Sequence, residues 1–121
     1  MAVFDDVARI GPQQIWDGVT GWVVHGERIT MGLVALDPGA VVPEHRHEQE
    51  QLGMVVRGSL RFRIGDESRE LGPGETYRIL SSEPHEAHAG PDGAVVIDVF
   101  SPPREDWKPI EAQPPRPPRW P

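Results

Sequence analysis

Short runs of apolar or alternating residues, separated by turn residues, make up most of the chain. In the run 59–64, Leu60, Phe62 and Ile64 alternate with two arginines. Because successive side chains of a strand point to opposite faces, we expect these three residues to point inward and the arginines outward. Runs of this kind predict strands at residues 22–25, 28–36, 51–57, 59–64, 68–71, 76–79 and 94–100.

The turn signals between these runs contain most of the glycines of the chain. Strands repeated about every 8–12 residues, with such signals between them, are typical of a β-sandwich or barrel. Helix signals are weak, and the best is one or two turns around residues 5–10. The pattern therefore predicts an all-β body. Its turn signals are Asp37-Pro38-Gly39, Arg57-Gly58, Gly65-Asp66, Gly72-Pro73-Gly74 and Gly90-Pro91-Asp92-Gly93.

The run 94–100 is apolar on both faces, which is typical of a strand that is covered on both sides. We expect a second sheet or a partner subunit to cover its outer face. Asp98 interrupts this run. An unpaired buried carboxylate is costly, so Asp98 is expected to have a partner or a chemical role. An ion pair with an interior arginine is the structural alternative.

Length and composition favour one domain with a tail. The chain has 121 residues, and all 13 glycines lie between Gly11 and Gly93, whereas eight of the 14 prolines lie from Pro102 onward. We therefore divide it into a body at 1–101 and a Pro-rich extension at 102–121. The extension is suited to polyproline II, either as a recognition peptide or lying along its own barrel. We favour the second interpretation, with Trp107 and Trp120 as anchors.

Charge and cysteine content exclude several classes of function. The chain has no cysteine, which rules out disulfides and thiolate metal sites. Its net charge of −7 argues against nucleic acid and anionic membranes as partners. No signal peptide and no apolar run of about 18 residues is apparent. We expect a cytoplasmic protein whose partner is a small molecule.

The candidate chemistry lies around two closely spaced histidines. His45 and His47 are two residues apart, so on a strand both imidazoles project from one face, which Gln51 shares by parity. His85 would come from another strand. Three imidazoles and an amide oxygen form a metal site of nitrogen and oxygen ligands. The alternative, that each histidine is a surface or satisfied core residue, is less favoured for His-x-His after a Pro-Gly turn.

The spacing of these residues resembles the two sequence motifs of the cupins. The resemblance covers about residues 27–107 and implies a double-stranded β-helix, a jelly-roll barrel, with one divalent metal inside. Nickel, zinc, manganese or iron would suit the site. The implied metal ligands are His45, His47, Gln51 and His85. The two stretches are Gly39-x5-His45-x-His47-x3-Gln51-x6-Gly58 and Gly74-x5-Leu80-x-Ser82-x2-His85-x3-Ala89.

The chain departs from the cupin motifs at three positions. Gln51 stands where most cupins have glutamate, and Leu80 and Ser82 replace a proline and a glycine in a turn. A neutral glutamine leaves the full charge of +2 on the metal, which makes it a stronger Lewis acid and disfavours a trivalent state. This favours redox-neutral chemistry on a carbonyl, enol or carboxylate.

The glutamine variant, followed by Asp98, Phe100 and Arg104, is similar to cupins of the pectin-degradation (KdgF-like) type. That resemblance implies a lyase or isomerase type of enzyme that converts 4,5-unsaturated uronates to 5-keto-4-deoxyuronates. It also implies that these three residues line the substrate site. Asp98 would take a proton from the anomeric hydroxyl, and Arg104, placed by a Pro-Pro corner, would hold an anionic group. A core role for Phe100 and a solvated Arg104 are the alternatives.

Two other classes of function are compatible with the sequence. One is a metal-dependent dioxygenase, which would consume oxygen. The other is a non-catalytic barrel that binds a small ligand without turnover. The substrate of the favoured enzyme would be an unsaturated sugar acid or a similar small carboxylate or enol. The family and the two-sided apolar run at 94–100 also predict a homodimer.

Overall fold

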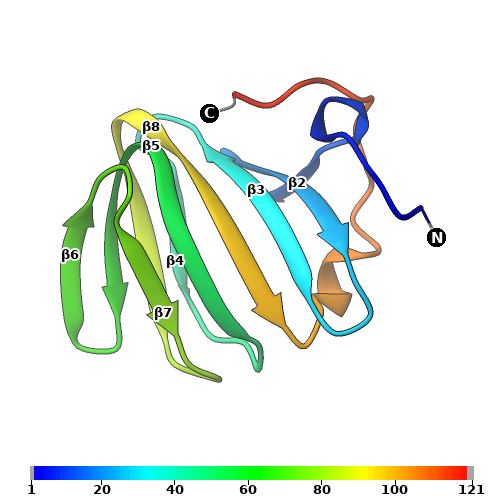
Figure 1. The fold of residues 1–121 in the computed structure, drawn as a ribbon. Coiled ribbons are helices and arrows are strands. Elements are labelled where there is room, and N and C mark those ends of the chain that lie inside the picture. Colours follow the sequence, from blue (N-terminus) through cyan, green and yellow to red (C-terminus); the bar gives the residue numbers. More distant parts are fainter. Residues whose placement is uncertain (1, 120–121) are drawn as a thin grey trace.

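The computed structural model describes residues 2–119, which form eight strands and two short 3-10 helices (Figure 1). Residues 1, 120 and 121, and with them the predicted anchor Trp120, lie outside the described residues. The helices are η1 (Val7–Arg9) and η2 (Glu105–Trp107). The strands are β1 (Gln13–Trp16), β2 (Val19–His25), β3 (Thr30–Leu36), β4 (Val41–His45), β5 (Glu50–Ile64), β6 (Glu67–Leu71), β7 (Thr76–Ile79) and β8 (His85–Ser101).

Two long strands, β5 and β8, each take part in two sheets. Residues 94–101 of β8 lie between β3 and the first part of β5, and β1, β2 and β7 extend this first sheet. Residues 85–89 of β8 lie between β4 and the last part of β5, and β6 completes the second sheet. One buried apolar cluster joins residues of both sheets. This architecture confirms the predicted all-β jelly roll.

The sequence pattern predicted turns at two points where the long strands only bend. Residues 57–58 and 90–93 stay within β5 and β8, and the register shifts between Gly58 and Leu60. Gly58 has a φ of 76°, and a Cβ atom there would overlap the carbonyl oxygen of Gly93. Gly58 therefore allows a β-bulge at the point where β5 and β8 pass from one sheet to the other. The separate strands expected at 51–57 and 59–64 are one strand.

The predicted facing of residues 59–64 is confirmed. Leu60 and Phe62 are 2% and 7% exposed, whereas Arg61 is exposed. In β8 the same alternation places Asp98 and Phe100 inside the barrel. Among the described residues, Asp98 is the one carboxylate that is buried. The division of the chain after residue 101 stays a proposal.

The outer face of the last strand is covered at one end by the chain's own terminal segments. Val95 packs in a small buried cluster with Trp22, on β2, and with Ile10, which precedes β1. The Nε1 atom of Trp22 donates a hydrogen bond to the carbonyl oxygen of Arg116, whose guanidinium lies over the indole ring. These segments, rather than a second sheet, cover this end. The contacts of Arg116 agree with the expectation that the Pro-rich extension lies along its own barrel (Figure 1).

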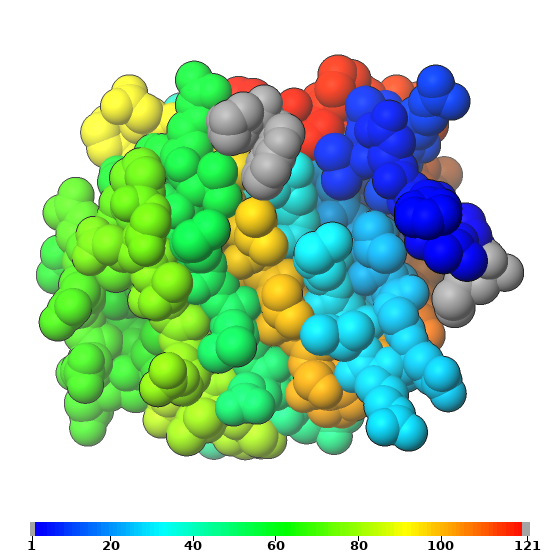
Figure 2. All heavy atoms as spheres, viewed as in Figure 1, coloured from blue at the N-terminus to red at the C-terminus, as the bar shows by residue number. Residues whose placement is uncertain are grey.

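The other end of the same outer face stays exposed and apolar. Val24, Met31, Val99 and Leu52 form one row across β2, β3, β8 and β5. Met31 is 48% exposed and Leu52 is 51% exposed. Figure 2 looks onto this side of the molecule, where β3, β8 and β5 run next to one another. A partner subunit bound to this face would bury this row.

Within the described chain, no helix has both the length and the apolar character that crossing a membrane requires. The cytoplasmic location expected from the sequence stays a prediction.

Candidate metal centre

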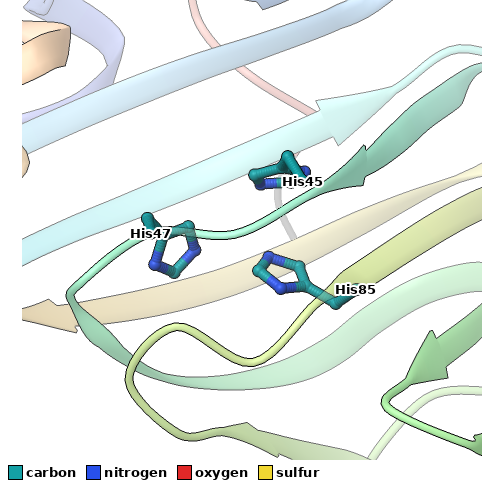
Figure 3. Close-up of side chains that lie close together, drawn as sticks. All are labelled: His45, His47 and His85. Carbon is teal, nitrogen blue, oxygen red and sulfur yellow. The ribbon is translucent and has the colours of Figure 1, made fainter.

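Three histidines from neighbouring segments converge at one end of the barrel. His45 ends β4, His47 lies in the loop after it, and His85 begins β8 opposite His45. One nitrogen atom from each ring lies within 4.8 Å of the others. Figure 3 shows the three rings turned toward one another. The expected strand through both His45 and His47 is wrong, because β4 ends at His45, yet the loop brings the two rings together.

The Nδ1 atom of each ring contacts a backbone carbonyl oxygen. Since a carbonyl only accepts hydrogen bonds, each Nδ1 carries the proton and each Nε2 keeps a free lone pair. This tautomer leaves three Nε2 atoms ready to bind a metal. The contacts are His45 to Pro43 at 2.9 Å, His47 to Gln49 at 3.0 Å and His85 to Glu83 at 2.8 Å.

Burial keeps two of these rings neutral. Loss of solvation lowers the pKa of His85 to about 4, with the charges of the other two histidines and of Arg104 as smaller causes. Loss of solvation also lowers the pKa of His47, followed by repulsion from Arg104. Neutral imidazole is the form that binds metals, so neither ring needs to lose a proton first at neutral pH.

Gln51, on β5, adds a fourth donor to the group. It is buried, and its Oε1 atom lies 3.1 Å from Nε2 of His47. The amide also bonds to the Asp98 carboxylate, which accepts hydrogen bonds, so its NH2 group faces Asp98 and its oxygen faces the histidines. The Oε1 atom of Gln51 and the Nε2 atom of His47 then point their lone pairs at each other. A cation bound between them would stabilise this arrangement. The donor set fits a divalent transition metal.

Asp98 lies on the inner face of β8 and is 7% exposed. The Tyr77 hydroxyl donates a hydrogen bond to its Oδ1 atom at 2.5 Å. Burial raises the pKa of Asp98 to about 6, while the hydrogen bonds from Tyr77 and Gln51 oppose that shift. The carboxylate is therefore mostly ionised at neutral pH. The expected interior arginine is not its ion-pair partner among the described residues, because Arg104 pairs with Asp106.

Arg104 is buried rather than solvated, at 7% exposed. Its guanidinium lies between the rings of Phe100 and Trp107, at 4.8 Å and 4.2 Å from their centroids. Nε and Nη2 donate to the two carboxylate oxygens of Asp106 at 3.0 Å and 2.9 Å. The backbone N–H of Arg104 donates to the Thr30 hydroxyl at 3.0 Å. These contacts hold the corner after β8, so the interpretation of Arg104 as a free tail residue is wrong.

A single cavity connects most of the predicted site residues. His47 is not among its lining residues, and its ring packs edge-on against Phe100, with centroids 5.8 Å apart. The neighbouring acids Glu44, Glu48 and Glu50 are exposed and do not line the cavity either, so they place no repulsive charge on its wall. Predicted site residues that line the cavity are His45, Gln51, His85, Asp98, Phe100 and Arg104.

Two further cavity residues, Trp16 and Tyr77, had no predicted role in the site. Trp16 lines the cavity, and its ring centroid lies 5.2 Å from that of His45. No strand was predicted around it, so no facing could be assigned. Tyr77 was given no role, although the alternation of residues 76–79 places Tyr77 and Ile79 on the inner face of a predicted strand. A tyrosine hydroxyl on an inner face was a usable signal.

Comparisons with known proteins agree with this architecture. The sequence model of one family, described as the cupin domain, matches residues 32–100. Pectin degradation protein KdgF of Dickeya dadantii (strain 3937) is 30% identical over 97 residues, which cover 78% of this chain and 88% of that protein. The structure of KdgF from Halomonas sp. is 30% identical with a TM-score of 0.80, covering 88% of this chain and 98% of that one. An RmlC-like cupin from Shewanella frigidimarina NCIMB 400, 24% identical, shares the fold with a TM-score of 0.82 and covers 88% and 96% of the two chains.

Proposed function

Because the chain belongs to the cupin family and resembles pectin-degradation proteins, we propose that it is a metal-dependent enzyme that opens the ring of a 4,5-unsaturated uronate. The product would be the corresponding 5-keto-4-deoxyuronate. One observation carries this proposal: two members of the three-histidine group, His45 and His85, line the same cavity as the buried carboxylate of Asp98. The reaction is an isomerisation that needs no oxidant.

We propose that His45, His47, Gln51 and His85 hold the metal. A divalent ion bound by them supplies positive charge that stabilises negative charge developing on a substrate oxygen. Their donors are neutral, so the ion keeps its full charge, which suits Lewis-acid chemistry better than a change of oxidation state. Nickel, zinc, manganese and iron all accept such a donor set.

Asp98 is the proposed general base. It accepts the proton of the anomeric hydroxyl, and the electron pair of that O–H bond forms the new aldehyde at C1. The bond between C1 and the ring oxygen breaks, and its electron pair stays on that oxygen as an enolate. C4 then takes up a proton and the 5-keto group forms. A carboxylate that is mostly ionised at neutral pH suits the first step.

Arg104 is the proposed binding site for the substrate carboxylate. Asp106 uses two of the five guanidinium N–H groups, and three remain as donors. We expect Arg104→Lys to raise KM by about 10–100-fold with a smaller effect on kcat, because an ammonium group cannot reproduce the planar fork. Arg116→Lys is the control, since Arg116 stacks on Trp22 outside the cavity. Steady-state kinetics showing equal KM values for Arg104→Lys and the wild type would contradict this role.

We also propose that a second copy of the chain covers the exposed apolar row on the outer sheet face, which gives the homodimer expected from the sequence. Leu52→Glu places a charge in this row, beside Val99. Light scattering should therefore show a dimer for the wild type and a monomer for Leu52→Glu. Val41→Glu is a matched control, because Val41 is 44% exposed on β4, in the other sheet. A wild-type monomer, or a Leu52→Glu dimer as stable as the wild type, refutes this contact.

The proposed activity is tested by identifying the product. The metal-loaded protein is incubated with 4,5-unsaturated galacturonate, and the mixture is followed by proton NMR. We expect the vinyl proton at C4 to disappear and the signals of the 5-keto product to replace it. A substrate that binds but keeps its vinyl proton at the uncatalysed rate indicates a ligand-binding protein and not this enzyme.

A further inference from the structure

Four residues form an unusual row across the first sheet, at the depth of the proposed general base. In register, Tyr77 on β7 lies beside Gly53 on β5, Gly53 beside Asp98 on β8, and Asp98 beside Gly32 on β3. All four are buried. Asp98 therefore has a glycine on each side, and its nearest polar side chain in the row is two strands away.

Gly53 allows that side chain to reach Asp98. A Cβ atom at Gly53 would overlap the ring carbons and the hydroxyl oxygen of Tyr77. The ring therefore lies directly over the glycine backbone, in the space that any other residue would fill. Phe62 packs on Tyr77 with ring centroids 4.6 Å apart. The Tyr77 hydroxyl is therefore fixed in position, because its ring is held between the backbone of Gly53 and the ring of Phe62.

The fixed hydroxyl is one of two donors to Asp98. Tyr77 donates to Oδ1, and Gln51, from β5, donates its amide N–H to the same carboxylate. Gln51 in turn directs its oxygen toward Nε2 of His47. A continuous chain of polar contacts thus runs from Tyr77 through Asp98 and Gln51 to the histidine group. Because carboxylates accept at several positions, a single donor would leave Asp98 free to rotate.

We propose that Tyr77 is the positioning residue of Asp98: its hydroxyl holds the carboxylate so that Asp98 faces the cavity and orients the amide of Gln51. The catalytic part of this inference rests on the proposed function. The inference also predicts an effect on metal affinity, which can be measured without a substrate. This effect follows because Asp98 orients Gln51, and Gln51 is a proposed metal ligand.

The kinetic test is a double-mutant cycle of Tyr77→Phe and Asp98→Asn. Loss of a hydrogen bond to a charged group costs about 10–100-fold, so we expect Tyr77→Phe to lower kcat by about that factor with little change in KM. In the Asp98→Asn background the same substitution should have almost no further effect, because the group on which Tyr77 acts is already altered. A residue that only packs the barrel would give additive effects.

The metal test uses cobalt(II) alone, whose visible absorption reports its ligands. Removing a hydrogen-bond partner of a metal ligand typically costs 10–100-fold in affinity, and Tyr77 lies one contact further away, so we expect Tyr77→Phe to bind cobalt about threefold to tenfold more weakly. Thr76→Val is the matched control, since it removes an exposed hydroxyl from the same strand. It should bind cobalt as the wild type does.

Tyr77 is the only tyrosine of the chain, so Raman spectroscopy of the tyrosine doublet reads its hydrogen bond directly. We expect a strong donor in the wild type and a weaker donor in Asp98→Asn. Unchanged cobalt affinity, together with either unchanged kcat or additive effects in the cycle, overturns the proposal. A wild type that does not turn over unsaturated uronates refutes the proposed function, while the cobalt titration still decides the role of Tyr77.

Discussion

Replacing His85 by alanine is expected to remove the metal and to lower turnover by about 10³-fold or more. His85 is 2% exposed and begins β8 directly opposite His45. Its loss leaves two imidazoles and an amide, and a small side chain there cannot supply another donor. Metal-assisted stabilisation of charge in the transition state contributes several kcal/mol, which corresponds to this loss of rate. Metal per chain, measured by mass spectrometry, and kcat check the prediction.

The matched control for this substitution is His88→Ala. His88 is on the same strand three residues later, but it is exposed, as its opposite facing from His85 predicts. It should keep both its metal and its activity. Equal metal content in His85→Ala and His88→Ala would contradict the assignment of His85 as a ligand.

The second large effect is expected for Asp98→Asn. Asparagine keeps the size of the side chain and can still accept from Tyr77, but it cannot accept the substrate proton. General-base catalysis typically contributes 10²–10⁴-fold, so we expect kcat to fall by about this factor while the metal is retained. Asp92→Asn is the control, because Asp92 is an exposed carboxylate on the same strand. Stopped-flow kinetics and metal analysis of both variants give the comparison.

Two outcomes distinguish the roles of Asp98. Lost turnover with full metal content supports proton transfer. Unchanged turnover and unchanged substrate affinity would show that the carboxylate is a structural acceptor for Tyr77 and Gln51 and takes no part in the reaction.

Local pattern was sufficient to predict an all-β body, and the resemblance to the cupin motifs supplied the jelly roll and the histidine group. Alternation in residues 59–64 predicted the facing of Leu60 and Phe62, and the motif spacing predicted that His45, His47 and His85 meet. For His47 the result was right but the reason was incomplete, because a loop rather than a strand carries it. The spacing of a motif predicts that its side chains come together, but it does not say whether a strand or a loop carries each of them.

Features that depend on the register between distant strands were not predictable. Tyr77 meets Asp98 because β7 and β8 both pair with β5 at Gly53, and periodicity within one strand carries no such information. The same limit applies to Arg104, whose burial depends on Trp107 and Phe100 around it. Glycines 58 and 93 were misread as turns because a bulge in a long strand needs the same residues as a turn.

The most direct test of metal-dependent, redox-neutral ring opening is the rate at which the protein removes the ultraviolet absorbance of the enol ether in an unsaturated uronate. The rate is measured in air and under nitrogen, with metal-loaded and chelator-treated protein. We predict equal rates in air and under nitrogen for the metal-loaded protein, and almost none after chelation until metal is restored. Loss of absorbance that requires oxygen would contradict the account in favour of a dioxygenase, and no loss with a fully loaded metal site would contradict it in favour of a binding protein.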